Sequence, residues 1–359
     1  MFARISAIVM AAGLVPGCSL LAAQNPPAPS GPDLILVLEP SAHAYADTVR
    51  SLSGGIPVVS AVPDWKGLNA DLETLAAGAE RGSLHSIQKT MTAIADLLGN
   101  AGIDPQRLVK YREVLVIAPR PVPLDLLTVA GEPLGRRIIF EYFIAADGPE
   151  LRAGLPRYLD ADKRPLERVG LLAIVPMPDG IPRGNQDIVR AALRLSARVP
   201  VDLVIEPTGR ESLQYFSRDD VSILHLDTHG SPDAVELGTN EEHFYGASEL
   251  PDHIRPPLIL LVGCSTGAGP RSLAPYLVRH GAGAVIGMAF VFRSGEPSGG
   301  DITDSLFYDT LWSGIAEGRT VGEALLRARQ AMPNNDWSVM WLLFGNANLQ
   351  FDLRRPPSF

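Results

Sequence analysis

A histidine and a cysteine stand at the ends of two apolar runs near the middle of the chain. His229 follows the run at 222–228, and Cys264 follows the run at 257–262 after one glycine. Both runs are predicted strands, and the carboxyl ends of parallel strands meet at the sheet edge where ligands bind. A thiol beside an imidazole is what a cysteine nucleophile and its base require. The two positions therefore predict catalysis by Cys264, with His229 as the base.

Small residues surround both side chains. Gly230 follows the histidine, and the segment GCSTG contains the cysteine. Glycine permits a sharp turn, and small neighbours leave room for a scissile carbonyl to reach the sulfur. We expect the backbone amides of Gly230 and Cys264 to hold the oxyanion. Taken singly, a His-Gly pair is usually only a turn and a lone cysteine only a small core residue; together they favour catalysis.

A serine in the same segment is an alternative nucleophile. Gly263, Ser265 and Gly267 satisfy the G-x-S-x-G pattern of a serine hydrolase elbow. That chemistry needs a histidine later in the chain. The only one after Ser265 is His280, on the next predicted helix and too near in sequence to return from a later loop. The serine hydrolase is therefore the weaker interpretation.

Strand-length apolar runs alternate with amphipathic segments along the chain, which predicts an α/β fold with a mainly parallel sheet and helices on both faces. Strands are predicted at 33–39, 56–62, 113–118, 137–145, 171–176 and 201–206, besides the two runs above. Helices are predicted at 42–52, 65–80, 83–98, 186–199, 210–217, 301–314 and 320–332.

The last predicted helix has a recognisable start. Thr320 with Glu323 predicts a capping box, and Ala324, Leu325 and Ala328 would form the packing face.

Amino-acid composition and charge argue against several classes of function. The 359 residues are 46% hydrophobic and 20% charged, as in ordinary globular proteins. A formal net charge of -9 gives no general attraction for nucleic acid. The two cysteines, Cys18 and Cys264, exclude a disulfide framework and a cysteine-based metal site. We expect neither a metal nor an organic cofactor.

Residues 1–30 have the architecture of a signal peptide. Arg4 precedes a short apolar stretch at 5–15, and a Pro/Ser-rich stretch follows. The segment VPGC, ending at Cys18, resembles a bacterial lipobox, although Pro16 is unusual there. We expect export to the cell envelope or periplasm, with lipidated Cys18 as a membrane tether. Ordinary signal cleavage and a cytoplasmic location are the alternatives.

Five separated segments together resemble the CHAT domain, a family of caspase-like cysteine peptidases of clan CD. They are ILHLDTHG, LILLVGCSTG, LAPYLVRHGAGAVIGM, LFYDTLWSGIAEGRTVGEALLRARQAM and the terminal W-x6-FGN. The resemblance implies a caspase-like fold, with His229 as base and Cys264 as nucleophile. The chain departs from the family at Val262-Gly263, where Ser-Ala is frequent, and at Phe290, where tryptophan is common.

The resemblance also divides the chain. It implies a peptidase domain at 113–359, which leaves 1–31 as export segment and linker and 32–112 as an α/β accessory region. The implied function is regulatory cleavage of a protein substrate, with activation by a protein partner as in many relatives. A catalytically silent scaffold or sensor is the alternative, since 32–112 carry no motif. Reactivity of Cys264 toward a thiol probe separates the two.

Substrate choice depends on the pocket beside the dyad. Relatives in the clan read the residue before the cleaved bond (P1) through a charged or polar pocket, and a basic P1 needs an acidic pocket floor. By position, the candidates are Asp227, Glu296 and Asp301, each of which can equally be a loop charge or a helix cap. We expect a basic P1. The remaining central histidines are interpreted as structural or surface residues: His225, His243 and His253.

Overall fold

The structure is a computed structural model. It describes residues 31–40, 45–80, 84–145, 147–174, 195–196, 198–239, 243–267, 272–289, 300–332 and 339–352, without the side chains at 76–80, 84–86 and 300–305. The predicted helix at 186–199 lies almost wholly outside these residues.

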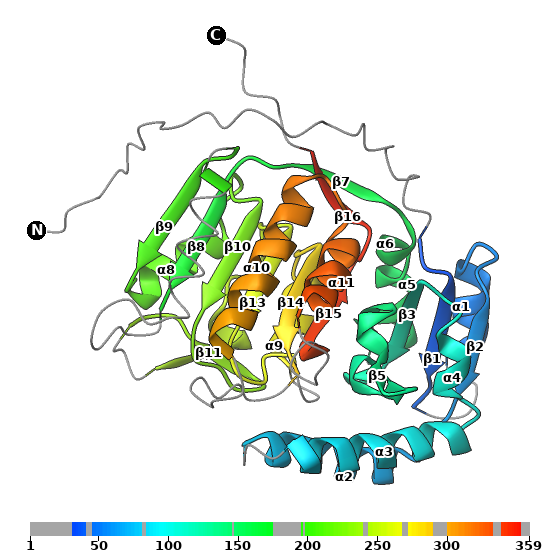
Figure 1. Cartoon of the computed structure of the whole chain (residues 1–359). Helices are drawn as coiled ribbons and strands as arrows, with labels where there is room; N and C mark the ends of the chain where they lie inside the picture. The colour runs from blue at the N-terminus through cyan, green and yellow to red at the C-terminus, as the bar shows by residue number, and fades with distance from the viewer. Residues whose placement is uncertain are drawn as a thin grey trace, which may run out of the picture.

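A ten-stranded sheet runs through the molecule in the order β2-β1-β3-β6-β15-β14-β13-β10-β8-β9 (Figure 1). Its strands are β1 Leu34–Leu38, β2 Val58–Ala61, β3 Glu113–Ala118, β6 Ile139–Ile144, β8 Val169–Ala173, β9 Val201–Ile205, β10 Ile223–Asp227, β13 Leu258–Val262, β14 Ala284–Met288 and β15 Trp341–Gly345. The group β14-β13-β10-β8-β9 is parallel throughout, and β15 is antiparallel to β14. The predicted α/β fold with a mainly parallel sheet is confirmed.

The described helices lie around the sheet, with α2 and α3 beyond the ends of its strands (Figure 1). They are α1 Ala46–Leu52, α2 Trp65–Glu80, α3 Leu84–Asn100, α4 Pro105–Leu108, α5 Gly148–Gly154, α6 Pro156–Leu159, α8 Gly209–Phe216, α9 Leu273–Arg279, α10 Gly300–Ala316 and α11 Val321–Ala331. Three short strand pairs lie outside the main sheet: β4 Thr128–Val129 with β5 Glu132–Pro133, β7 Asp162–Pro165 with β16 Leu349–Asp352, and β11 Ala234–Glu236 with β12 Phe244–Gly246. Within the described part of the chain, none of the helices is long and apolar enough to cross a membrane.

The burial of β10 shows why the sheet needs helices on both faces. Leu224 and His225 are successive strand residues and point to opposite faces, as their spacing predicts. Leu224 lies with Tyr215 of α8 over a glycine of β8. The His225 ring lies 5.5 Å from Tyr308 and 5.7 Å from Trp312, both on α10. Helices α8 and α10 therefore cover opposite faces of the strand that leads to His229.

The start of α11 agrees with the sequence in part. The Thr320 hydroxyl accepts from the Glu323 N–H at 3.2 Å, and the predicted packing residues are buried. The second half of the predicted capping box is wrong, because the Glu323 carboxylate pairs with Arg112 instead. An ion pair formed across the fold has replaced the expected local bond.

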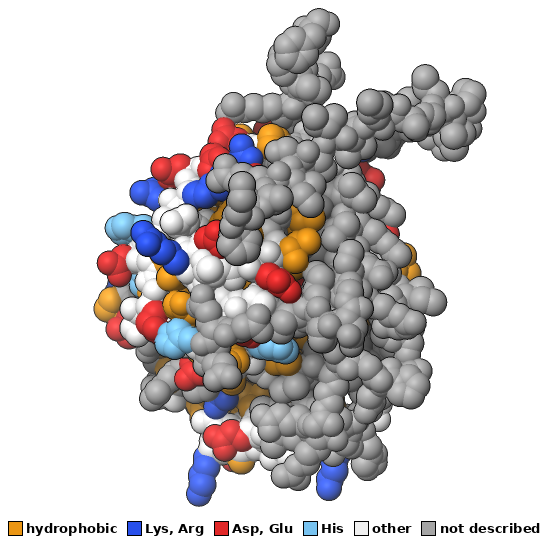
Figure 2. Space-filling view, turned by 90° about the vertical axis from the view of Figure 1, so that its left-hand side faces the viewer, with side chains coloured by type: hydrophobic (Ala, Val, Ile, Leu, Met, Phe, Trp, Pro, Cys, Tyr) orange, Lys and Arg blue, Asp and Glu red, His pale blue; other side chains and the backbone are white. Residues whose placement is uncertain are grey.

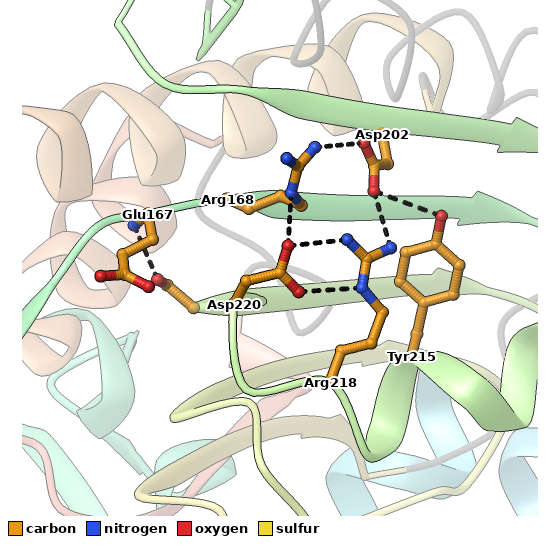
Figure 3. A network of polar contacts seen from close by, with 7 residues as sticks. Glu167, Arg168, Asp202, Tyr215, Arg218 and Asp220 are labelled. Atoms are coloured by element: carbon orange, nitrogen blue, oxygen red, sulfur yellow. Dashed lines mark hydrogen bonds and ion pairs between the residues drawn. The ribbon is translucent and has the colours of Figure 1, made fainter.

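Alternating charges tie together the segments that enter β8, β9 and β10 (Figure 3). Arg168 contacts Asp202 at 2.7 Å and Asp220 at 2.8 Å, and Arg218 contacts the same two carboxylates at 2.9 and 2.8 Å. Hydrogen bonds from Arg218, and to a lesser extent from Arg168, lower the pKa of Asp220 to about 2. Acidic, basic and histidine side chains also interleave over the described part of the β9 side of the molecule (Figure 2). The network holds together the amino ends of these three strands, and the opposite end of β10 leads to His229.

Strands from the predicted accessory region belong to the same sheet as the rest. β1 pairs with β3 along four residues, and β2 pairs with the other side of β1. The helical hairpin α2–α3 contacts the ends of two of these strands: the Trp65 indole donates to the Glu39 carbonyl, and Arg120 donates to Asn69. The division of the chain into an accessory region and a peptidase domain stays a prediction.

Candidate active site

The candidate residues follow two strands that are hydrogen-bonded neighbours. Asp227 of β10 pairs with Val262 of β13 at the last position of the parallel register, and the Thr228 N–H donates to the Val262 carbonyl at 2.9 Å. His229 comes next and is exposed, whereas Cys264 follows β13 after one glycine and is half-buried. The structure therefore brings the two residues to adjacent turns at one edge of the sheet.

The turn after β13 has the cysteine at its corner. The Thr266 N–H donates to the Gly263 carbonyl at 3.3 Å, so Cys264 and Ser265 are the central residues of a β-turn. Ser265 has a φ of 58°, a left-handed conformation that costs an L-residue roughly 1–2 kcal/mol. Strain of this kind is concentrated at functional sites.

Accessibility favours the thiol over the hydroxyl in this turn. Ser265 is only 5% exposed, whereas Cys264 is half-buried. The next described helix after the G-x-S-x-G segment is α9, which begins at Leu273. His280 stacks on Tyr276 with ring centroids 3.8 Å apart and lines a cavity at the opposite edge of the sheet. The one histidine that follows Ser265 in the sequence therefore lies away from it, which leaves the serine hydrolase as the weaker alternative.

The turn after β10 rests on the ribbon formed by β11 and β12, which the sequence did not predict. The His229 carbonyl accepts from the Glu236 N–H at 3.0 Å, and the Ser231 N–H donates to the Ala234 carbonyl at 2.8 Å. These two bonds flank Gly230, so its own N–H and carbonyl point away from the ribbon. The Gly230 N–H therefore makes no hydrogen bond within the ribbon, and its predicted role at an oxyanion stays a prediction.

Two threonines and two glycines pack the turns together. A Cβ on Gly230 would lie 2.8 Å from the Thr266 methyl and 3.0 Å from the Cys264 carbonyl oxygen. A Cβ on Gly263 would lie 3.3 Å from the Thr228 methyl and 3.5 Å from the Gly230 Cα. Larger residues at either glycine would push the two turns apart. Neither threonine was singled out from the sequence, in which Thr228 ends a predicted strand and Thr266 follows the cysteine by two residues.

Of the three predicted substrate-binding residues, the structure describes the side chain of Asp227 alone. Asp227 is half-buried and lies on the β10 face covered by α10, two residues before His229. Glu296 lies outside the described residues, as does Cys18. Asp301 falls inside the first turn of α10, which begins at Gly300, so the suggestion that it precedes the helix as a cap is wrong; its side chain is not described.

Other histidines lie away from the two turns. His225 is fully buried, and burial lowers its pKa to about 3. His243 is exposed on the β11–β12 ribbon, with its Nε2 2.8 Å from Glu249. A cavity of about 630 Å³ opens at the amino ends of β8, β10 and β13, opposite the candidate site, and is lined in part by Arg164, Glu167, Ser222, His253, Arg255 and His280. Among the described residues, no group of three His, Cys, Asp or Glu side chains could hold a metal ion.

Comparisons with known proteins place this geometry in a class. The family model described as Peptidase family C25 matches residues 196–351, a stretch that includes both candidate residues. The crystal structure of the Arg specific cysteine proteinase gingipain R (RgpB) is similar with a TM-score of 0.54 and 15% identity, over 90% of this chain and 79% of that chain. The complex of Porphyromonas gingivalis RgpB pro- and mature domains gives a TM-score of 0.55 and 15% identity, over 89% and 79%. None of the curated proteins compared with the chain matches it.

The fold and the matched family model define a cysteine-type endopeptidase of clan CD, with the caspase-like fold. The predicted fold, class and enzyme type are confirmed. Within the class, the family model that matches is Peptidase family C25. The finer prediction of a CHAT domain receives no support from it.

Proposed function

We propose that the protein cleaves protein substrates with a catalytic dyad of His229 and Cys264. The observation that carries the proposal is the pairing of β10 with β13, whose following turns come into contact through Gly230 and Gly263. The base and the nucleophile therefore stand on adjacent turns that contact each other. The left-handed Ser265 beside the thiol gives added support, because it turns the chain away directly after the cysteine.

The mechanism follows from these positions. His229 takes the thiol proton of Cys264, and the sulfur attacks the peptide carbonyl to form a tetrahedral oxyanion. The N–H groups of Gly230 and Cys264 donate to that oxyanion. His229 then gives the proton to the leaving amine, which departs and leaves an acyl-enzyme. Water, deprotonated by His229, attacks the thioester, and the thiol is restored as the acid product leaves.

We extend the proposal to a basic residue at P1. The gingipain R to which the fold is similar is described as Arg specific. Asp227 offers a half-buried carboxylate at the end of β10, close in sequence to the base. A guanidinium or ammonium group held by a carboxylate forms charge-assisted hydrogen bonds, which are stronger than neutral ones. Glu296 and Asp301 stay candidates for the same pocket.

Cleavage of fluorogenic peptides tests the dyad. We expect the wild type to cleave peptides with Arg or Lys at P1, and Cys264→Ala to abolish cleavage. His229→Ala should lower kcat by roughly 10²–10⁴-fold, the usual contribution of a general base. His243→Ala is the matched control, since this exposed histidine lies on the neighbouring ribbon. Wild-type cleavage by Cys264→Ala, or an equal effect of the two histidine substitutions, would exclude the dyad.

A second set of variants tests the pocket. Asp227→Asn should lower kcat/KM for Arg peptides roughly tenfold to a hundredfold, because a hydrogen bond to a charged group contributes about 1.5–3 kcal/mol. Peptides with Leu at P1 should be affected little. Asp252→Asn, at an exposed aspartate before β13, controls for the loss of one negative charge. If Arg and Leu peptides suffer equally in Asp227→Asn, this carboxylate does not read P1.

We also propose export to the cell envelope or periplasm, with Cys18 as a membrane tether and a protein partner as activator. The support is the signal-like composition of residues 1–30 and the VPGC segment. Fractionation of cells that express the wild type and Cys18→Ser tests the tether: the wild type should sediment with membranes and the variant should not. Activity of the purified enzyme that does not rise on adding cell extract would argue against the partner.

A further inference from the structure

Thr266 links the end of one strand to the end of the next, and it is fully buried. Its hydroxyl lies 3.2 Å from the Leu261 carbonyl and 3.0 Å from the Gly263 carbonyl, and shares its proton between them. The same hydroxyl accepts from the Met288 N–H at 3.2 Å. One side chain thus fastens the turn that follows β13 onto the end of β14.

The methyl group of Thr266 faces the other turn of the candidate site. It lies 2.8 Å from the position of a Cβ on Gly230 and 3.1 Å from that of a Cβ on Gly263. It therefore fills the space between the turn that carries Cys264 and the turn that carries His229. Neither contact involves the thiol or the imidazole themselves.

We propose that Thr266 is a positioning residue that holds Cys264 within hydrogen-bonding distance of His229. The inference rests on the dyad proposed above. The hydroxyl holds the cysteine turn against β14, and the methyl sets the separation from the histidine turn. A base must lie about 2.6–3.2 Å from the atom whose proton it takes. A displacement of about 1 Å can lower the rate about a hundredfold.

Two substitutions separate the roles of the hydroxyl and the methyl. Thr266→Val keeps the shape and removes the three polar contacts, and Thr266→Ser keeps the hydroxyl and removes the methyl. We expect Thr266→Val to lower kcat roughly tenfold to a hundredfold, with KM changed less than about twofold. The loss in Thr266→Ser should be smaller but measurable. The rate at which iodoacetamide alkylates Cys264 at pH 6, relative to glutathione, should fall in Thr266→Val toward that of glutathione.

Thr320→Val is the matched control. Thr320 is also buried and its hydroxyl caps α11, but it touches neither turn. The thermal midpoint should fall in this variant as well, while kcat and the alkylation rate stay at wild-type values. A purely structural Thr266 would behave in the same way as Thr320.

The outcomes distinguish this inference from the proposed function. Wild-type kcat and alkylation in Thr266→Val, with only a lower thermal midpoint, would overturn the positioning role and leave the dyad intact. A wild-type enzyme alkylated no faster than glutathione would overturn the dyad and the inference with it. If Thr266→Val does not fold, Thr266→Ser decides, and wild-type kcat in that variant refutes the proposal.

Discussion

Replacing His225 by methionine should stabilise the protein, and more so in acid. His225 is fully buried between β10 and α10, and neither ring nitrogen has a hydrogen-bond partner among the described residues. Each unsatisfied buried polar group costs roughly 1–3 kcal/mol, so an apolar residue of similar volume removes a penalty. At pH 7 we therefore expect His225→Met to be at least as stable as the wild type.

The pH dependence gives the sharper measurement. Burial lowers the His225 pKa from 6.5 to about 3, so below pH 6.5 the unfolded chain binds a proton that the folded chain does not. The stability that depends on a neutral His225 is therefore fully present above pH 6.5. The free energy of unfolding decreases as the pH falls from 6.5 toward 3. One such group changes the free energy of unfolding by about 1.4 kcal/mol per pH unit, or about 2 kcal/mol between pH 7 and pH 5.

Urea denaturation at pH 5, 6, 7 and 8 measures this loss. The free-energy difference between His225→Met and the wild type should grow by about 2 kcal/mol from pH 7 to pH 5. His253→Met, at an exposed histidine, should show no such growth. A difference that is the same at pH 5 and pH 7 would mean that His225 takes up its proton inside the fold, and would refute the reasoning.

Two further predictions concern a buried carboxyl and a glycine. Burial raises the pKa of Glu113 to about 7, so its contribution to stability is present below pH 4.5 and is lost as the pH rises to 7. Glu113→Gln should therefore gain stability over the wild type between pH 5 and pH 8, by on the order of 3 kcal/mol in urea denaturation; no gain would mean that the carboxyl is ionised in the fold. Gly230→Ala should lower kcat at least roughly tenfold, because its Cβ would meet the Thr266 methyl and the Cys264 carbonyl. Gly99→Ala, a helical position with open space, should keep full activity, and equal kinetics for the two alanine variants would contradict the close approach of the turns.

Local pattern was enough to predict the central strands of the sheet. Continuous apolar runs predicted β1, β3, β10 and β13 within one or two residues of their observed bounds, because buried parallel strands need apolar side chains on both faces. The alternation of side chains along a strand places His225 and Leu224 on opposite faces of β10, as the structure shows.

Contacts between segments far apart in the sequence could not be predicted from local pattern. The ion pair of Glu323 with Arg112 replaced half of a predicted capping box. Arg112 lies far from Glu323 in the sequence, so only the tertiary structure brings the two side chains together. The β11–β12 ribbon escaped prediction because its strands are only three residues long, too short for a periodic signal. Thr266 was not recognised because a threonine after a cysteine has no pattern of its own, and its three polar contacts all arise from folding.

The sequence by itself determined that His229 and Cys264 stand at the ends of apolar strands, with glycines beside them, in a chain of caspase-like α/β pattern. Only the tertiary structure decided that β10 and β13 are direct neighbours, that Cys264 is more exposed than Ser265, and that Thr266 fills the space between the two turns. The physical reason is how far apart in the sequence the interacting residues lie. Hydrophobic periodicity along a chain reports which residues are buried, whereas the register between strands and the close approach of two turns depend on packing between residues far apart in the sequence.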